Sequence, residues 1–480
     1  MTKIKDKKIK ISCVGMSGKE VTGSAYLVEC PTGEKILLDC GLYQSNNKYE
    51  DYKINQKKFN FKPNELTFVA LTHLHIDHEG RLPLLYKRGA NCKTYITYDN
   101  VEFMKPMLKD CAKIMDRDCF GFSRKLGKIV EPLYNENDVN ECMEHILGVE
   151  YNDIIQITDN VSIKFISSGH IYGACQIILY IKNQSGKITK LAYSGDLGNT
   201  LFNQPFVKPF ESIEKVDMYI GECTYNDDKR SVKSFQRDKD IELIKNVIYQ
   251  TCDLEHGTVL IPTFALQRME TILFTLYNIY HNDENFNIPI YVDSPLAVEI
   301  IDCFSNNLDK ENKDLWDEIL NWKNINIIRS IEQSKATVTS DEPKIVCSSS
   351  GMLTQGRSIL YLKHILPQAN SCIILCGYMA EGTIGYKIKN NPIQKTITID
   401  GKAYPNRCNI KALKSFSSHM QYEQLINYYT NLAKNGCEVI WLVHSDDGKI
   451  KFKQELENNI KKIGKTTKII ATNFDTVGRI

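Results

Sequence analysis

Short apolar runs recur along the chain, and each is followed by a polar or glycine-rich segment. Runs of three to five residues rich in Ile, Val, Tyr and Phe are typical of buried strands. The runs are Phe68–Leu71, Ile163–Ile166, Leu191–Tyr193, Met218–Ile220, Val259–Ile261, Ile290–Val292, Ile345–Cys347, Ile373–Leu375 and Val439–Val443. Helical patterns lie between many of them, as at Ser234–Gln250 and Ala265–Tyr280. This alternation predicts an α/β protein with layered sheets.

Two segments depart from this alternation. Near the N-terminus, Val21–Val28 and Lys35–Leu38 flank the turn Pro31-Thr32-Gly33, which predicts a hairpin. Further along, the enrichment of Asn and Lys over Asp302–Lys323 predicts a solvent-facing helical excursion rather than a linker.

Length and composition limit the class of protein. A chain of 480 residues predicts two or three domains, and 42% hydrophobic with 25% charged residues excludes disordered and fibrous classes. The formal charge of +2 excludes a globally basic nucleic-acid binder, although a local basic groove stays open. No apolar run approaches the ~18 residues that would span a membrane, and the lysine-rich start does not resemble a secretion signal.

The sixteen cysteines are spread singly and contain no C-x-x-C pair. This spacing is typical of small buried side chains in a reducing compartment, so we expect a cytoplasmic protein.

The strongest chemical signal is the segment Thr72-His73-Leu74-His75-Ile76-Asp77-His78, directly after a predicted strand. Three imidazoles and one carboxylate lie within six residues, and a loop can direct all four toward one point. Imidazole with carboxylate suits zinc or a neighbouring divalent metal. Chance gives this H-x-H-x-D-H pattern with a probability on the order of 10⁻⁴ per chain.

Three more ligand-type side chains each follow a predicted strand. They are His170 in Ser-Gly-His, Asp196 in Ser-Gly-Asp, and His444 at the end of its apolar run. Each alone is more often an ordinary surface or core residue. Together with the first cluster they complete a set large enough for a two-metal site.

This set resembles the metallo-β-lactamase fold, and the rest of the chain resembles the β-CASP branch of nucleic-acid-processing nucleases. Glu222-Cys223-Thr224-Tyr225 is similar to motif A of that branch, Ser415-Phe416-Ser417-Ser418-His419 to motif B, and His444 occupies motif C. Four further segments resemble signatures of the β-CASP insert: Ile261–Ala265, Asp293–Ala297, Ser348–Leu353 and Gly377–Thr383.

The resemblance implies an α/β architecture, namely an αββα metallo-β-lactamase sandwich interrupted by an inserted α/β β-CASP domain. We expect the first part of the sandwich at residues 1–227, the β-CASP domain at 228–400 and the second part of the sandwich at 401–480.

The resemblance also implies roles for single residues. One metal would be held by His73, His75 and His170, the other by Asp77, His78 and His444, with Asp196 bridging both. The expected cofactors are two Zn²⁺ ions, with Mn²⁺ or iron as alternatives. We expect four residues to carry the catalysis: Asp77 at the metals, Asp39 as a carboxylate that supports the metal-binding imidazoles, His419 as proton donor and Glu222 as its partner.

The implied activity is hydrolysis of RNA phosphodiester bonds by a hydroxide that two metals activate. RNA is favoured over DNA because RNA-cleaving members carry His at motif C, as here, whereas DNA-processing relatives typically carry Val. The compact layout resembles prokaryotic members similar to the endonuclease subunit of the cleavage and polyadenylation factor, which favours an endonuclease.

Several alternatives stay open. They are a 5′–3′ exonuclease of the RNase J type, a DNA-directed nuclease, a small-molecule hydrolase and a catalytically silent RNA-binding scaffold. The expected partner is single-stranded RNA, without a membrane, and a homo-oligomer is left open. Backbone N–H groups of strand-to-helix loops could hold phosphate, so we expect substrate contacts at Ser349, Ser350, Gly351, Arg357, Gly377 and Tyr378.

Overall fold

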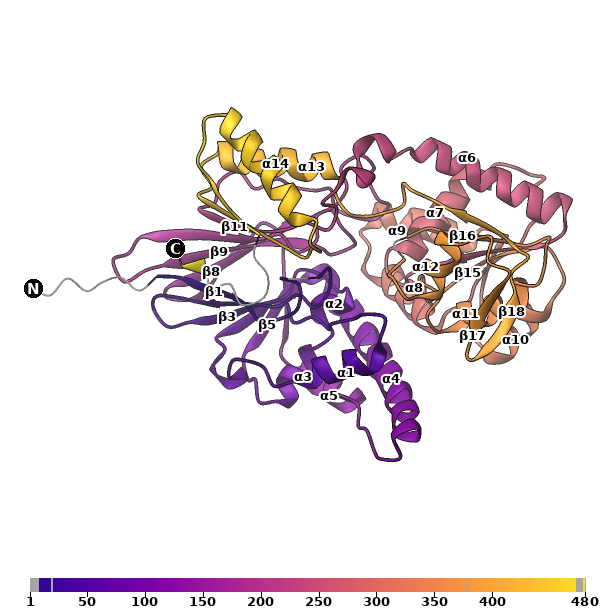
Figure 1. The fold of residues 1–480 in the computed structure, drawn as a ribbon, viewed down its shortest axis with the longest axis horizontal. Helices are drawn as coiled ribbons and strands as arrows, with labels where there is room; N and C mark the ends of the chain where they lie inside the picture. The colour runs from indigo at the N-terminus through magenta and orange to yellow at the C-terminus, as the bar shows by residue number, and fades with distance from the viewer. Residues whose placement is uncertain (1–7, 19, 378, 472–477, 480) are drawn as a thin grey trace, which may run out of the picture. The chain divides into compact units, whose positions relative to one another are not determined.

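The chain forms two compact units, as the computed structural model in Figure 1 shows. The structure describes residues 8–18, 20–377, 379–471 and 478–479. Unit 1 is built from Met1–Val232 and Ser418–Ile480, and unit 2 from Lys233–Ser417. Unit 2 is therefore an insertion into the sequence of unit 1.

Unit 1 contains two sheets, each of seven strands within the described residues. The first has the order β22-β1-β2-β3-β4-β5-β6, and the second the order β21-β20-β11-β10-β9-β8-β7. The strands of the first sheet are β1 (Lys10–Cys13), β2 (Tyr26–Glu29), β3 (Lys35–Leu38), β4 (Phe68–Ala70), β5 (Lys93–Thr97), β6 (Ile146–Val149) and β22 (Gly478–Arg479). Those of the second are β7 (Ile154–Thr158), β8 (Val161–Ser167), β9 (Cys175–Lys182), β10 (Ile188–Tyr193), β11 (Met218–Glu222), β20 (Val439–Val443) and β21 (Lys468–Ile470).

The two sheets of unit 1 pack face to face around one apolar core. Tyr26 and Phe68 from the first sheet share a buried cluster with Phe165 and Trp441 from the second. Because alternate side chains of a strand point to opposite faces, each sheet contributes one apolar face to this core.

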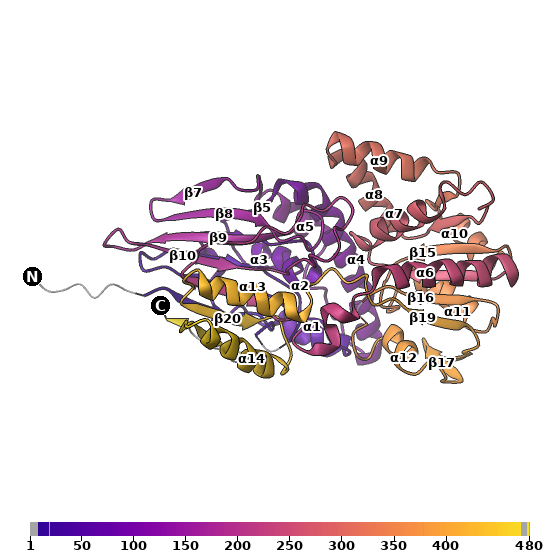
Figure 2. The ribbon, with the colours of Figure 1, turned by 90° about the horizontal axis from the view of Figure 1, so that it is seen from above.

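Helices cover the outer faces of both sheets of unit 1. On the second sheet, α13 (Tyr422–Lys434) and α14 (Lys449–Lys462) pack side by side through a buried apolar cluster, and Figure 2 shows both running along the strands. On the other side of the sandwich, α3 and α5 lie below β3 and β5 in Figure 1. The helices of this part are α1 (Lys48–Gln56), α2 (Ile76–Glu79), α3 (Leu82–Lys87), α4 (Val101–Leu126) and α5 (Glu136–Met143).

Unit 2 is an α/β domain around a six-stranded sheet of order β14-β13-β15-β12-β16-β19, and all its strand pairs are parallel. The strands are β12 (Thr258–Pro262), β13 (Ile290–Val292), β14 (Ile325–Ile327), β15 (Lys344–Ser348), β16 (Cys372–Leu375) and β19 (Asn409–Ala412), with a separate hairpin of β17 (Thr396–Ile399) and β18 (Lys402–Pro405). The helices are α6 (Arg237–Ile248), α7 (Arg268–Tyr280), α8 (Pro295–Asn307), α9 (Lys310–Asn321), α10 (Ile331–Thr339), α11 (Arg357–Ile365) and α12 (Ile384–Asn390).

The predicted architecture is confirmed: unit 1 is an αββα sandwich, and an α/β unit is inserted into it. Two details differ from the sequence analysis. The first hairpin strand begins only at Tyr26, and the residues before it bond irregularly. The Ser24 N–H donates to Asp77 O on α2, while Gly23 O and Ala25 O accept hydrogen bonds from residues 14–17. The boundary expected at 400/401 falls inside the β17–β18 hairpin, whereas unit 2 continues to Ser417 because β19 pairs with β16. Among the described residues, no helix is both long and apolar enough to cross a membrane.

Candidate metal centre

The predicted ligands of unit 1 lie in segments that directly follow strands. The segment containing His73 follows β4, and Asp39 follows β3, which runs parallel to β4. In the second sheet, β8, β10 and β20 run in one direction, since β9 is antiparallel to its two neighbours and β10, β11 and β20 are parallel. Their carboxyl ends therefore meet at one edge and bring together His170, Asp196 and His444.

The short helix α2 carries Asp77 and His78. Backbone hydrogen bonds from the loops that follow β3 and precede β2 fix its position. The backbone N–H of Cys40 donates to His78 O at 2.7 Å, and that of Ser24 to Asp77 O at 2.8 Å. A Cβ atom placed on Gly41 would lie only 1.7 Å from Asp77 O. Glycine at this position therefore permits the close approach of the loop to the ligand helix.

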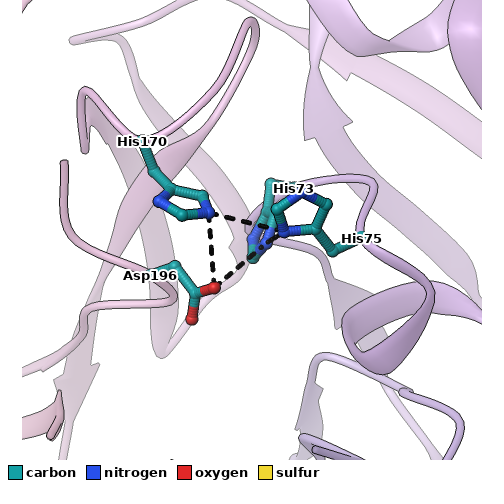
Figure 3. A group of neighbouring side chains, drawn as sticks. All are labelled: His73, His75, His170 and Asp196. Atoms are coloured by element: carbon teal, nitrogen blue, oxygen red, sulfur yellow. Dashed lines mark hydrogen bonds and ion pairs between the residues drawn. The ribbon is translucent and has the colours of Figure 1, made fainter. Parts of the chain in front are cut away.

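Four side chains form a first ligand cluster, shown in Figure 3: His73, His75, His170 and Asp196. His75 Nδ1 lies 3.0 Å from His73 Nε2 and 3.4 Å from His170 Nε2. Asp196 Oδ2 closes the group at 3.5 Å from His73 Nε2 and 3.4 Å from His170 Nε2. All four ligand atoms lie within 4.8 Å of one another, which suits one cation.

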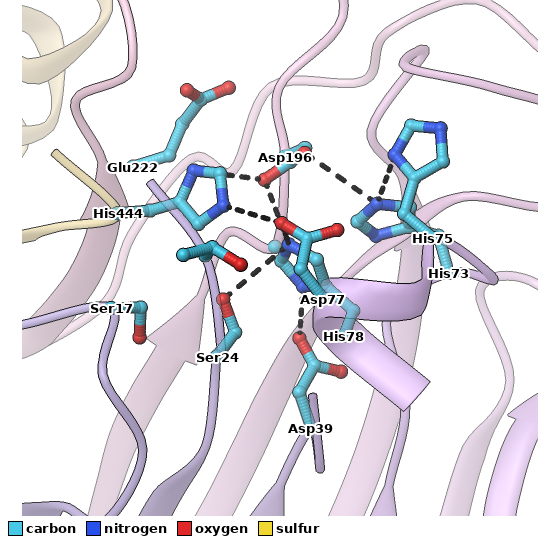
Figure 4. A network of polar contacts seen from close by, with 12 residues as sticks. Ser17, Ser24, Asp39, His73, His75, Asp77, His78, Asp196, Glu222 and His444 are labelled. Atoms are coloured by element: carbon cyan, nitrogen blue, oxygen red, sulfur yellow. Dashed lines mark hydrogen bonds and ion pairs between the residues drawn. The ribbon is translucent and has the colours of Figure 1, made fainter. Parts of the chain in front are cut away.

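A second cluster adjoins the first and consists of Asp77, His78 and His444 (Figure 4). Asp77 Oδ2 lies 3.2 Å from His444 Nε2 and 3.8 Å from His78 Nε2. His78 Nε2 also lies 3.3 Å from Asp196 Oδ1. Asp196 thus directs one oxygen at each cluster, which is the arrangement of a carboxylate that bridges two cations.

Asp39 is fully buried and supports the second cluster. Its Oδ2 accepts a hydrogen bond from His78 Nδ1 at 2.7 Å, which directs His78 Nε2 toward the cluster. The same carboxylate accepts from the Thr72 N–H and hydroxyl and from the Tyr193 hydroxyl, each at 2.8 Å. Such partners hold a ligand imidazole in one tautomer and orientation.

The pKa values of the first-cluster imidazoles are lowered. Burial, followed by the neighbouring imidazoles, holds the pKa of His73 and His170 well below the usual value, and burial lowers the pKa of His75 to about 4. These imidazoles are therefore neutral at pH 7, with lone pairs available to a metal.

The pKa values of Asp77, Asp196 and His78 shift in the direction that favours their charged forms. Burial alone would raise the pKa of Asp77 and of Asp196, but the adjacent imidazoles, among them His78 and His444, hold both pKa values below the usual one. Burial would lower the pKa of His78, but Asp196, Asp77 and Asp39 raise it well above its usual value. The negative charge of the three carboxylates is what a cation at this place would neutralise.

Two buried polar atoms that lack a hydrogen-bond partner in the described part of the chain are also consistent with a metal site. Within the described residues, His170 Nδ1 and Asp196 Oδ1 are buried without a hydrogen-bond partner. A buried polar atom in this state costs about 1–3 kcal/mol unless a ligand or water compensates. The donor set therefore fits two divalent cations.

The buried Glu222 and the partly buried His419 form a pair beside the first cluster. His419 Nδ1 lies 3.3 Å from Glu222 Oε1, and His419 Nε2 lies 3.9 Å from Asp196 Oδ2. Burial lowers the pKa of His419, but Glu222, followed by Asp196 and Tyr225, raises it to about 10 in sum. The backbone N–H of Leu197 donates to Glu222 Oε1 at 2.6 Å and fixes the carboxylate.

The expected substrate-binding residues lie in unit 2, in the loops that follow β15 and β16 and at the start of α11. The guanidinium of Arg357 already forms an ion pair with the fully buried Asp293. Asp293 also accepts hydrogen bonds from the hydroxyls of Ser334 at 2.6 Å and Tyr361 at 2.8 Å. Tyr378 lies outside the described residues.

Three hydroxyl side chains that contact this centre were not predicted from the sequence. Thr72 and Tyr193 donate to Asp39, and Thr224 Oγ1 lies 2.9 Å from His444 Nδ1. Thr224 stands in a quoted motif, but nothing in the sequence indicates which side chain its hydroxyl contacts.

The families of similar known proteins are consistent with a metal centre at this place. The model of the metallo-beta-lactamase superfamily matches residues 18–149, and the model of the Beta-Casp domain matches residues 269–388. The chain is 30% identical over 446 residues to the ribonuclease TTHA0252 of Thermus thermophilus, covering 90% of this chain and 93% of that protein.

Two proteins of Methanocaldococcus jannaschii are also similar. The transcription termination factor FttA is 28% identical over 485 residues, covering 98% of this chain and 71% of that protein. An RNase J-like protein is 30% identical over 426 residues, covering 87% of this chain and 88% of that protein. The chain therefore belongs to the β-CASP family of the metallo-β-lactamase superfamily.

Proposed function

We propose that this protein is a metal-dependent ribonuclease that hydrolyses RNA phosphodiester bonds. The observation that carries the proposal is the placement of Asp196 between the two histidine clusters, with one oxygen toward each. The names of the relatives, a ribonuclease and an RNase J-like protein, support RNA as the substrate.

Two Zn²⁺ ions are the proposed cofactors, with Mn²⁺ or iron as alternatives. The residues that would hold one ion are His73, His75 and His170, those for the other are Asp77, His78 and His444, and Asp196 would contact both. When bound, such ions supply Lewis-acid stabilisation of phosphodiester oxygens and lower the pKa of a water molecule.

The protein's own side chains supply orientation and a proton. Asp39 holds His78 with Nε2 toward the centre. Because Glu222 and other nearby acidic groups raise the pKa of His419 to about 10, the His419 imidazolium retains its proton at pH 7. We propose that it donates this proton to the leaving oxygen of the RNA, and general acids of this kind contribute about 10²–10⁴-fold to the rate.

The proposed substrate is single-stranded RNA, cut internally. Backbone N–H groups at Ser349, Ser350, Gly351 and Gly377 remain proposed phosphate contacts, together with Tyr378. Arg357 is a weaker candidate than the sequence suggested, since Asp293 already neutralises its charge. All sixteen cysteines are free thiols, which favours a reducing compartment, and we propose the cytoplasm.

The similarity to an RNase J-like protein favours one second candidate, a 5′–3′ exonuclease. Digestion of one RNA labelled at either end, in 5′-triphosphate and 5′-monophosphate forms, separates the two. Internal fragments that do not depend on the 5′ group would establish the endonuclease. Mononucleotides released only from the monophosphate form would establish the exonuclease, and RNA left intact by the fully metallated protein would refute both.

A further inference from the structure

We propose that Thr224 is a positioning residue for the second metal cluster, and that its hydroxyl sets which nitrogen of His444 faces the metal. The inference rests on the proposed two-metal function and concerns one of its ligands. Thr224 itself would contact neither metal nor RNA.

The hydroxyl of Thr224 contacts His444 at two points. Thr224 Oγ1 lies 2.9 Å from His444 Nδ1, and the hydroxyl donates to His444 O at 3.4 Å. A hydroxyl that donates to the carbonyl keeps lone pairs for the Nδ1–H of the imidazole. His444 Nε2 is then left without hydrogen, and it faces Asp77 Oδ2 at 3.2 Å.

A competing partner for the same nitrogen lies farther away. Asp196 Oδ1 is 3.6 Å from His444 Nδ1, beyond ordinary hydrogen-bond length. Thr224 is therefore the closer acceptor, and Asp196 Oδ1 stays available to the cluster. Asp39 holds the other imidazole, His78, in the same way through its Nδ1.

The backbone of Thr224 is fixed, so its hydroxyl has a defined position. Its N–H donates to Glu222 Oε2 at 3.2 Å. The preceding N–H, of Cys223, donates to Val443 O at 2.8 Å and continues the pairing of β11 with β20. The segments that carry Thr224 and His444 are thus joined directly.

Side chains farther along join the same two segments. The amide of Asn226 donates to Ser445 Oγ at 2.8 Å and to Asp446 Oδ1 at 2.6 Å.

The backbone of His444 is held from its other side. Its φ of 51° lies in the left-handed region, and its N–H donates to Ser17 O at 2.7 Å. With the main chain fixed, rotation of the side chain is the freedom that remains. The Thr224 hydroxyl removes that freedom by holding Nδ1.

Thr224→Val tests this inference, since valine keeps the shape of threonine and lacks the hydroxyl. Thr224→Ser is the matched control because it keeps the hydroxyl, and His444→Ala is the reference for a lost second site. Zn²⁺ is titrated into each metal-free protein against a chromophoric chelator, which gives a Kd for each of two ions.

We expect wild type and T224S to bind two ions with similar Kd values, and H444A to bind one tightly. T224V should bind the first ion as wild type does and the second about 10–100-fold more weakly. If T224V binds both ions with the Kd values of wild type, or if its binding of both ions is weakened equally, the role of Thr224 is overturned. If T224V does not fold, as judged by circular dichroism, T224A carries the same comparison.

The titration also separates this inference from the function on which it rests. Fewer than two tight sites in wild type would refute the proposed two-metal centre, and the role of Thr224 with it. Two tight sites in wild type with unchanged binding in T224V would refute the role of Thr224 alone.

Discussion

At the scale of single residues, a substitution in the pair of Glu222 and His419 can distinguish a loss of proton transfer from a loss of metal binding. Replacing His419 by Gln should leave two bound metals and lower kcat by about 10²–10⁴-fold, because the leaving oxygen loses its proton donor. Elemental analysis of the purified variant and single-turnover cleavage of RNA measure the two quantities. Wild-type turnover with full metal content would remove His419 from the mechanism.

Asp196 is the residue whose loss should affect both metals. Asp196→Asn removes the charge that both clusters share and should weaken the binding of both Zn²⁺ ions. Asp77→Asn serves as the matched control, since Asp77 belongs to the second cluster and should weaken one ion only. Calorimetric titration of Zn²⁺ measures both, and a D196N protein with one unaffected site would contradict the bridging role.

The sequence indicated which histidines and carboxylates cluster better than it indicated the side chains that support them. Histidines are rare in this chain, so a segment such as His73–His78 is informative by itself. Thr72, Thr224 and Tyr193 carry hydroxyls of ordinary residue types, and their roles depend on contacts that only folding creates. Residue type alone could not reveal them.

At the scale of elements, the ends of parallel strands explain why distant ligands meet. The predicted apolar runs lie in strands, and ligands that follow parallel strands must meet at one edge. The start of β2 was less predictable because apolar and polar residues alternate over 21–25, and this alternation is itself typical of a strand. The carbonyls of Gly23 and Ala25 accept hydrogen bonds from residues 14–17, whereas Ser24 bonds to Asp77 and Gly41.

The contact between the Gly41 loop and α2 gives a prediction at this scale. Gly41→Ala would place a methyl group 1.7 Å from Asp77 O, so the ligand helix must shift. We expect a loss of roughly 1–3 kcal/mol in the free energy of unfolding and weaker Zn²⁺ binding. Denaturant unfolding and metal titration measure these effects.

Gly121 in α4 is the matched control, since a Cβ there would meet nothing within 4 Å. Gly121→Ala should stabilise the protein by up to about 1 kcal/mol. Equal behaviour of the two alanine variants would contradict the account of Gly41.

At the scale of the whole molecule, each unit has its own core and should respond separately to pH. Glu270 of unit 2 is fully buried, and burial raises its pKa from 4.5 to about 8. Between these pH values the unfolded chain has lost a proton that the folded chain keeps. The stability of unit 2 should therefore fall as pH rises from about 4.5 to about 8, by roughly 1.4 kcal/mol per pH unit at most.

Glu270→Gln should flatten this dependence, because an amide does not ionise. Calorimetric unfolding from pH 5 to 8 measures the transition of unit 2 in both proteins. An equally steep pH dependence in E270Q would show that another group is responsible.

The division into units was predictable in outline from the sequence, but its second boundary was not. The metallo-β-lactamase and β-CASP motifs indicated an insertion, and the structure has one. Residues 401–417 carry only the short strands β18 and β19, which belong to unit 2 because they pair with β17 and β16. A four-residue strand does not reveal its partner by composition.

The central claim is that two cations bound by the seven side chains of the two clusters enable this protein to cut RNA. The most direct measurement is cleavage of single-stranded RNA while metal-free protein is titrated with Zn²⁺. The account predicts no cleavage without metal and a rise to full activity at about two equivalents. RNA that stays intact with two equivalents bound, or cleavage that is complete without metal, would contradict it.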